Sequence, residues 1–261
     1  MMMTINSNRN TPIFYKETGK LDGPALILLH SGGMSHSEWQ PQLPLFEKYY
    51  HVICIDQPGH GASLMQATRL SIQECGLAVL NVMAQLQIEQ AHFCGSSMGG
   101  ATTLWLARHY PEKISKMILY RVNYRKNAGT FEQTNLMANP EYWQKVGLDG
   151  YLSKLHEAQG NKESWKQVVQ RVSEALDPEH SDHNHTIADL NKMQMPCLIV
   201  CGDRDPLVPI ADLLAMYAAF PHADLWIMPH ASHVTATNTW RGNIFAEEAH
   251  RFLVRVRDLS L

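Results

Sequence analysis

The chain has 261 residues, of which 45% are hydrophobic and 18% charged, and its formal net charge is −3. This composition is that of a globular protein able to bury a core, and the charge gives no attraction for nucleic acid or for an anionic membrane surface. No apolar run approaches the ~18 residues of a transmembrane helix. The first residues carry neither the basic nor the apolar region of a signal peptide.

The first quarter of the chain contains two continuous apolar runs, 25–29 and 52–55. Such runs are typical of parallel strands that are covered on both faces. We expect an earlier strand over 11–18 and a helix over about 39–49. Polar, glycine-containing loops follow the two apolar runs, His30-Ser31-Gly32-Gly33 after the first and Asp56-Gln57-Pro58-Gly59-His60-Gly61 after the second.

The next segment alternates helix and strand. Ser71 is suited to cap a helix that reaches about residue 86, because its hydroxyl can accept an N–H three residues on. An apolar run over 91–94, a helical pattern over 101–109 and an apolar run over 116–120 follow. Alternation of this kind indicates βαβ units and a mostly parallel sheet.

Residues 122–192 interrupt this alternation, and helical periodicity replaces it. The apolar residues of one stripe recur at helical spacing and predict an amphipathic helix: Trp165, Val168, Val169, Val172 and Leu176. We therefore expect a helical insertion here. The alternating pattern then resumes, with strands over 197–201 and 224–228 and helices over about 210–220 and 243–257.

The segment Gly95-Ser96-Ser97-Met98-Gly99 joins an expected strand to an expected helix and has the pattern Gly-x-Ser-x-Gly. This is the context of a nucleophile elbow, in which glycines two residues either side of Ser97 let the backbone pass closely. Ser96 does not fit, since Cys94 and Met98 would stand at its glycine positions. A serine nucleophile also needs a histidine and a carboxylate, which in open parallel sheets gather at the carboxyl ends of the strands.

Two late strands are followed by such groups. The strand over 197–201 is followed by Gly202-Asp203-Arg204-Asp205-Pro206-Leu207-Val208-Pro209. The strand over 224–228 is followed by Pro229-His230-Ala231-Ser232-His233. With the earlier loops and the serine motif in this order, the chain resembles the α/β-hydrolases that carry a helical cap. The resemblance implies an α/β fold with a doubly wound, mostly parallel sheet. It implies a hydrolase core over 1–121 and 193–261 and a helical cap over 122–192.

The resemblance also implies a role for each matching position. Ser97 matches the nucleophile, Asp205 the triad acid and His233 the catalytic histidine. Asp203 is the alternative acid, although we expect it to be a turn residue that binds its own backbone. His230 is the alternative histidine, and it stands at the strand end.

The expected oxyanion hole consists of the backbone N–H groups of Met98 and Gly32. Gly33 is the neighbouring alternative, because Ser31 stands where the family usually has glycine. His30 is expected to brace this loop rather than to take part in the chemistry.

Candidates for substrate binding are less well defined. Arg121 ends a strand at the expected pocket mouth, where it or Arg125 could bind a substrate carboxylate. The alternative is an arginine that extends to solvent or pairs within the cap. Trp143, Tyr151 and Trp165 could line an apolar pocket, although their spacing favours helix packing.

The cysteines and a cluster of three histidines are residue types that can bind metal, but we expect both to have structural roles. Cysteines in apolar runs are expected to be buried thiols of the core: Cys54, Cys94, Cys197 and Cys201. His180, His183 and His185 lie in a polar stretch. We expect an exposed connection there, with a metal site as the alternative.

The resemblance implies a serine hydrolase that cleaves a carboxylic ester-like bond of a small molecule through an acyl-enzyme, without metal or organic cofactor. Thioesterases, lactonases and carbon–carbon bond hydrolases share the same triad and remain alternatives. A non-hydrolytic binding protein and a cofactor-free haloperoxidase are further alternatives. We expect a small-molecule substrate, no nucleic-acid or membrane partner and a cytoplasmic location; the sequence leaves the oligomeric state open.

Overall fold

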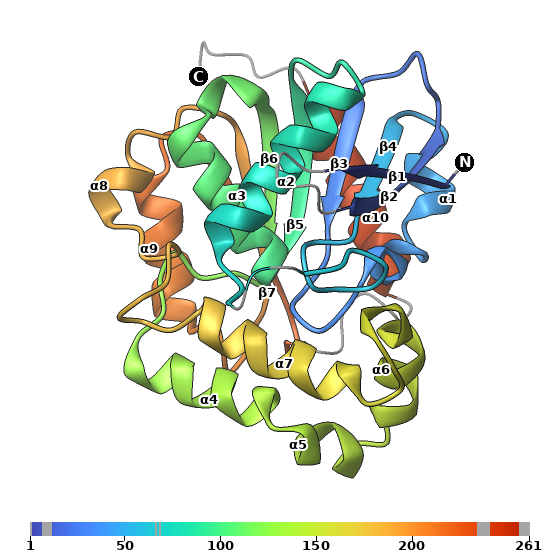
Figure 1. Cartoon of the computed structure of the whole chain (residues 1–261). Coiled ribbons are helices and arrows are strands. Elements are labelled where there is room, and N and C mark those ends of the chain that lie inside the picture. The colour runs from blue at the N-terminus through green and yellow to red at the C-terminus, as the bar shows by residue number, and fades with distance from the viewer. Residues whose placement is uncertain (1, 7–11, 66, 68, 234–240, 256–261) are drawn as a thin grey trace.

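The protein is built on a single eight-stranded sheet, seen in a computed structural model that describes residues 2–6, 12–65, 67, 69–233 and 241–255 (Figure 1). The strand order is β1-β2-β4-β3-β5-β6-β7-β8, and the strands from β4 to β8 in this order pair in parallel. β2 pairs antiparallel with both β1 and β4. The expected mostly parallel sheet is therefore confirmed. The strands are β1 Met2–Asn6, β2 Pro12–Gly19, β3 Ala25–Leu29, β4 His51–Ile55, β5 Ala91–Ser96, β6 Ile114–Tyr120, β7 Cys197–Gly202 and β8 Ala223–Met228.

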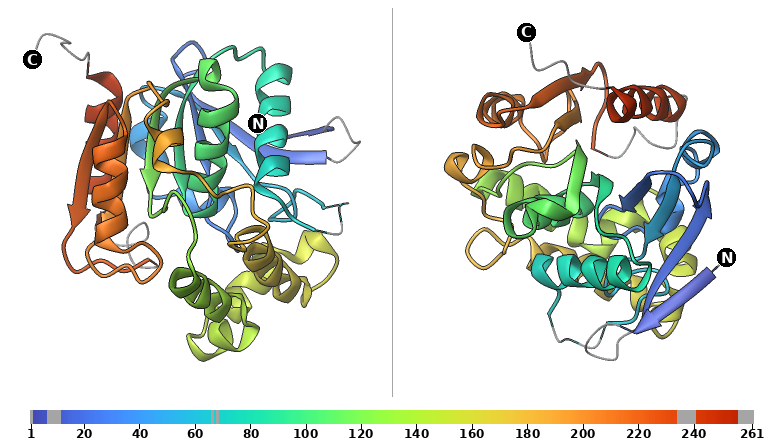
Figure 2. Two further views of the ribbon diagram at one scale, coloured as in Figure 1. Left: turned by 90° about the vertical axis from the view of Figure 1, so that its left-hand side faces the viewer. Right: turned by 90° about the horizontal axis from the view of Figure 1, so that it is seen from above.

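Helices cover both faces of this sheet, because alternate side chains of each central strand point to opposite sides. In β3, Ile27 and Leu29 belong to one hydrophobic cluster, whereas Leu26 and Leu28 belong to another. The first cluster includes residues of α2 (Ile72–Gln85), α3 (Met98–His109) and α9 (Ile210–Ala219). The second includes residues of α1 (Leu43–Phe46) and α10 (Arg241–Val254). Figure 2 shows α10 and α2 on opposite sides of the sheet, so the sheet is doubly wound.

A second helical layer lies beyond the carboxyl ends of the strands (Figure 1). Its helices are α4 Ala128–Ala138, α5 Pro140–Lys145, α6 Asp149–Leu155 and α7 Ser164–Ala175, and the shorter η3 Glu157–Gln159 lies between the last two. Trp143, Leu152, Trp165 and Val169 form a hydrophobic cluster within this layer. The amphipathic helix expected around Trp165 is confirmed as α7. The division of the chain into core and cap stays a prediction.

Some expected elements differ from the structure. The helix expected over about 39–49 is wrong: a short 3-10 helix, η1 (His36–Trp39), and the four-residue α1 take its place. Pro41 and Pro44 account for this, since proline lacks an N–H donor and disfavours helical backbone in the residue before it. Strand β1 was not predicted. The expected ends of the first strand at Thr11 and of the last helix at Arg257 lie outside the described residues.

The described helices include none that is both long and apolar enough to span a bilayer.

Candidate active site

Ser97 lies on a sharp turn between β5 and α3. Its backbone has φ 52° and ψ −112°, a conformation that side-chain-bearing residues rarely adopt and that is found at strained functional turns. The flanking glycines make the turn possible: a Cβ on Gly95 would overlap the carbonyl of Gly99, and one on Gly99 would overlap the carbonyl of Leu29. The Ser97 N–H donates to the carbonyl oxygen of Tyr120 at 2.8 Å. The serine side chain is therefore held at the carboxyl end of the sheet.

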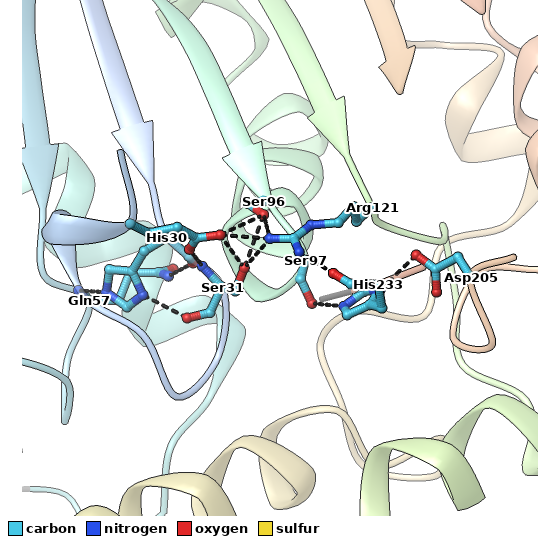
Figure 3. Close-up of polar contacts among 9 residues, drawn as sticks. His30, Ser31, Gln57, Ser96, Ser97, Arg121, Asp205 and His233 are labelled. Atoms are coloured by element: carbon cyan, nitrogen blue, oxygen red, sulfur yellow. Dashed lines mark hydrogen bonds and ion pairs between the residues drawn. The ribbon is translucent and has the colours of Figure 1, made fainter. Parts of the chain in front are cut away.

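His233 joins Ser97 to Asp205 (Figure 3). The Nε2 atom of His233 lies 3.0 Å from the Oγ atom of Ser97, and Nδ1 lies 2.7 Å from the Oδ2 atom of Asp205. The other carboxylate oxygen of Asp205 accepts the Leu207 N–H at 2.8 Å, which fixes the carboxylate. The three side chains that the sequence assigned to a triad are thus within hydrogen-bond distance in the order serine, histidine, acid.

The protonation states suit a neutral imidazole beside an ionised carboxylate. Burial lowers the pKa of His233 below its usual value; the carboxylate of Asp205 opposes this, while the positive charges of Arg121 and Lys126 add to it. Burial alone would raise the pKa of Asp205, but His233 and the Leu207 N–H outweigh burial and lower it. Near pH 7 the imidazole therefore has a free lone pair for a proton.

The two competing residues lie elsewhere. The carboxylate of Asp203 accepts the N–H of Ala231 at 3.2 Å, so it joins the loop after β7 to the loop after β8 instead of binding its own turn. The side chain of His230 is exposed, and its carbonyl accepts a hydrogen bond from Arg241. Within the described residues, neither of them forms a hydrogen bond with Ser97.

The loop after β3 brings a second set of backbone groups to the serine. The Gly99 N–H donates to the His30 carbonyl at 3.1 Å, which ties this loop to the turn at Ser97. His30 braces the loop, because its Nδ1–H donates to the Ser31 carbonyl at 2.7 Å and its Nε2 accepts the Gln57 N–H at 2.9 Å. Gly32 follows directly and lines the same pocket as Ser97.

The backbone N–H groups of Gly32 and Met98 have no acceptor among the residues that the structure describes. Met98 is the first residue of α3, where an N–H has no intrahelical partner. Both groups are therefore available to a ligand, which is the condition that an oxyanion hole requires.

Arg121 does not extend to solvent and does not pair within residues 122–192. Its guanidinium forms a buried ion pair with Glu38 at 2.6 Å and donates to the Ser96 hydroxyl at 2.7 Å. It also donates to the hydroxyl of Ser31 and to the carbonyl of His233. The alternative of an arginine reaching solvent is wrong, because the side chain of Arg121 is 5% exposed. Its partners come from the segment 31–38, the end of β5 and the loop after β8. Sequence reasoning missed Glu38, which carries no motif.

The pocket in front of Ser97 has a volume of about 170 Å³. Helices of the second layer supply much of its apolar wall, including Trp143 and Tyr151, as one sequence interpretation suggested. Trp165 packs inside that layer instead. Lys126, which sequence reasoning did not single out, lines the pocket as well. A cavity of this size accommodates a ligand about as large as a single small ring.

The histidines of the connection after α7 correct one expectation. His183 and His185 are 1% and 2% exposed, so the exposed connection predicted for them is wrong. The stretch folds back on the core, and the His185 N–H donates to the Tyr124 carbonyl at 3.1 Å. His180 is exposed. Within the described parts of the chain, no group of three or more histidine, cysteine, aspartate or glutamate residues is arranged to hold a metal ion.

The chain is similar in sequence and in fold to known hydrolases. Residues 24–154 match the family model for the alpha/beta hydrolase fold. The 3-oxoadipate enol-lactonase 2 of Acinetobacter baylyi is 31% identical over 243 residues, which cover 85% of this chain and 86% of that protein. The crystal structure of the enol-lactonase from Burkholderia xenovorans LB400 has a TM-score of 0.76 at 22% identity, over 97% of this chain and 100% of that one. The meta-cleavage product hydrolase from Pseudomonas fluorescens IP01 has a TM-score of 0.77 at 21% identity, over 96% and 97% of the two chains.

Proposed function

Because the chain belongs to the alpha/beta hydrolase fold family, we propose that it is a serine hydrolase that cleaves a carboxylic ester-like bond of a small molecule. The observation that carries the proposal is the pair of hydrogen bonds made by His233, to Ser97 at 3.0 Å and to Asp205 at 2.7 Å. A serine oxygen, a neutral imidazole and a buried carboxylate in this order are the parts that acyl transfer needs.

In the first half-reaction, the Oγ atom of Ser97 attacks the substrate carbonyl while Nε2 of His233 takes its proton. Asp205 accepts the Nδ1–H of His233, so it holds the imidazole in the tautomer whose Nε2 lone pair faces the serine. It also stabilises the imidazolium that forms. The negative charge that develops on the carbonyl oxygen is met by the free N–H groups of Gly32 and Met98.

The first half-reaction ends when His233 gives this proton to the leaving-group oxygen, the bond between that oxygen and the carbonyl carbon breaks, and the acyl group stays on Ser97. In the second half-reaction a water molecule gives a proton to His233 and attacks the acyl carbonyl. The bond to the Oγ atom of Ser97 then breaks, His233 returns the proton to Oγ, and the acid product leaves. Helices α4–α7 lie over the strand ends in this scheme and act as a cap that limits the access of bulk water.

The strongest alternative substrate within this chemistry is a lactone, which is a cyclic ester. The Acinetobacter relative that is 31% identical over most of both chains is named an enol-lactonase, and the pocket of about 170 Å³ has room for one small ring. The intermediate would be the same acyl-enzyme, with the leaving alcohol still attached to the acyl group.

Hydrolysis of p-nitrophenyl acetate and butyrate by the wild type and by Ser97→Ala tests the proposal. We expect the wild type to hydrolyse at least one ester and the variant to lose at least ~10³-fold in kcat. A fluorophosphonate should also form one covalent adduct, which peptide mapping assigns to Ser97. Equal rates for the two proteins, or an adduct at another residue, would overturn the proposal.

A non-hydrolytic binding protein is the alternative from a different functional class. It predicts that the wild type hydrolyses neither ester and forms no fluorophosphonate adduct while small carboxylic esters still bind. Calorimetry with ethyl butyrate on the wild type therefore separates the two functions: binding without turnover supports the binding protein, and turnover that depends on Ser97 supports the hydrolase.

A further inference from the structure

The pocket in front of Ser97 has an unbalanced charge. Among the described residues that line it, three have side chains charged near pH 7: Glu38, Arg121 and Lys126. Glu38 and Arg121 neutralise one another in an ion pair at 2.6 Å. One positive charge, on Lys126, is left over in a pocket whose other walls are largely apolar.

Lys126 lies between β6 and α4, five residues after Arg121 in the sequence. Its side chain is half-buried, and its Nζ atom forms no hydrogen bond or ion pair with any residue of the described ranges. Burial lowers the pKa of Lys126 to about 8, against the opposing effect of Asp205, so most of the ammonium keeps its proton at pH 7. A cation held in an apolar pocket without a partner is costly unless a ligand supplies the opposite charge.

The charge of Lys126 also affects the pKa of His233 in the candidate triad. It contributes, after burial, to the lowered pKa of His233, and the carboxylate of Asp205 acts on Lys126 in turn. Lys126, Ser97 and His233 line the same pocket of about 170 Å³, so one small ligand can contact both the ammonium and the reacting groups. A ligand that spans them needs an acyl carbon at Ser97 and a negative group a few atoms away.

We propose that Lys126 binds a carboxylate carried by the substrate, so that the pocket selects small esters or lactones that also contain an acid group. This inference rests on the proposed function for the identity of the bond that is cleaved. A carboxylate fits because its single negative charge balances the single unpaired cation, whereas a phosphate dianion would leave one charge unbalanced. The apolar walls strengthen the interaction by keeping water from the ion pair.

A binding measurement tests the lysine without any turnover. Monomethyl adipate, which carries one ester and one carboxylate, is titrated into Ser97→Ala and into Ser97→Ala/Lys126→Met by calorimetry, with neutral dimethyl adipate as the second probe. We expect the lysine substitution to raise the Kd of monomethyl adipate by about 10-fold or more. The Kd of dimethyl adipate should change by no more than about twofold. Equal loss for both probes, or loss for neither, would overturn the carboxylate site.

A kinetic measurement uses the intact nucleophile. Two substrates are compared, the mono-p-nitrophenyl ester of adipic acid, which carries a carboxylate, and p-nitrophenyl butyrate, which does not. The ratio of their kcat/KM values is measured for the wild type, Lys126→Met, Lys126→Arg and Arg125→Met. We expect the ratio to fall by about 10-fold or more in Lys126→Met, mainly through KM, and to recover partly in Lys126→Arg.

Arg125→Met is the matched control. The sequence also suggested Arg125 as a carboxylate ligand, but its side chain is exposed and is not among the residues that line the pocket, so its removal should leave the ratio as in the wild type. A ratio that falls equally in Arg125→Met and Lys126→Met would indicate general attraction and overturn the site. If no ester is hydrolysed, the proposed function fails while the calorimetric result still decides the role of Lys126.

Discussion

The carboxylate of Glu38 lies 2.6 Å from the guanidinium of Arg121, and the two side chains are 4% and 5% exposed. Three segments of the site meet at this ion pair. Glu38 accepts the N–H and hydroxyl of Ser31 at 2.7 and 2.8 Å. Arg121 donates to the Ser96 hydroxyl and to the carbonyl of His233. The pair therefore joins the loop before Gly32, the residue before Ser97 and the backbone of the histidine.

Removing one partner of this pair should destabilise the protein strongly. In Arg121→Met the carboxylate of Glu38 stays buried without its counter-charge, and we expect the free energy of unfolding to fall by about 3–5 kcal/mol. The double variant Glu38→Gln/Arg121→Met should recover part of this loss, because no charge is then left unpaired. Urea denaturation of the three proteins measures both effects.

The exposed pair of Arg251 with Glu248 supplies the control. Arg251→Met should change the free energy of unfolding by no more than about 0.5 kcal/mol, since water screens exposed ion pairs. If Arg121→Met were as mild as Arg251→Met, the buried pair would not hold the three segments together.

Asp205→Asn should separate the role of the acid from that of its neighbour Asp203. Asparagine can donate to Nδ1 of His233 and so favour the wrong tautomer, and we expect kcat on p-nitrophenyl butyrate to fall by about 10⁴-fold. Asp203→Asn keeps an oxygen for the Ala231 N–H, so its kcat should stay within a few-fold of the wild type. The opposite ranking of the two variants would make Asp203 the acid.

The acid limb of the pH–rate profile should lie below pH 6.5. His233 must be neutral to accept a proton from Ser97, and burial lowers its pKa even though Asp205 opposes the change. We expect kcat/KM to rise with pH through a midpoint below 6.5 and to be level from about pH 7. A midpoint at or above 6.5 would mean that His233 is more solvated, or more strongly stabilised by Asp205, than the structure indicates.

The residues predicted well from sequence lie in short motifs that determine their own local backbone. Gly95 and Gly99 are required by the close approach of the turn to neighbouring carbonyls, so the pattern around Ser97 specifies a strand, a turn and a helix together. Asp205 and His233 could be found because parallel strands bring their carboxyl ends to one edge. The order of the strands was not needed for these assignments.

Glu38 and Lys126 could not be predicted in this way. Glu38 meets Arg121, which is 83 positions away, only because η1 follows β3 and the sheet places β3, β5 and β6 side by side. The place of Lys126 in the pocket wall depends on how helices α4–α7 lie over the strand ends. The polar stretch around His183 misled for a similar reason: its composition is that of an exposed loop, but tertiary packing buries it.

The glycine at the start of α3 should tolerate no side chain. In Gly99→Ala the new Cβ would overlap the backbone carbonyl of Leu29, which cannot move without shifting β3. We therefore expect the free energy of unfolding to fall by about 3 kcal/mol and the activity to be lost. Gly150→Ala is the matched control, because nothing lies within 4 Å of its Cβ position in α6. That variant should be more stable by about 0.5–1 kcal/mol. Thermal denaturation of both distinguishes a steric effect from a general effect of replacing glycine.

The buried histidines should make the protein less stable as the pH falls from 6.5 to about 4. Burial lowers the pKa of His156 and of His185 to about 4, whereas both titrate near 6.5 in the unfolded chain. Between these values the unfolded state binds protons that the folded state does not. The stability is therefore complete above pH 6.5 and decreases toward pH 4, by about 1.4 kcal/mol per pH unit for each histidine.

His156 provides the test of this pH dependence. Its Nδ1 accepts the Gly61 N–H at 3.0 Å and its Nε2–H donates to the Gly33 carbonyl at 2.9 Å, so both nitrogens are used in the neutral form. In His156→Gln the slope of unfolding free energy against pH, measured by urea denaturation between pH 6.5 and 4.5, should decrease by about 1.4 kcal/mol per unit. His230→Asn changes an exposed histidine at a positive φ that asparagine tolerates, so it should keep the wild-type slope. An unchanged slope in His156→Gln would mean that the imidazole accepts a proton in the folded protein, and that its contact with Gly61 breaks first.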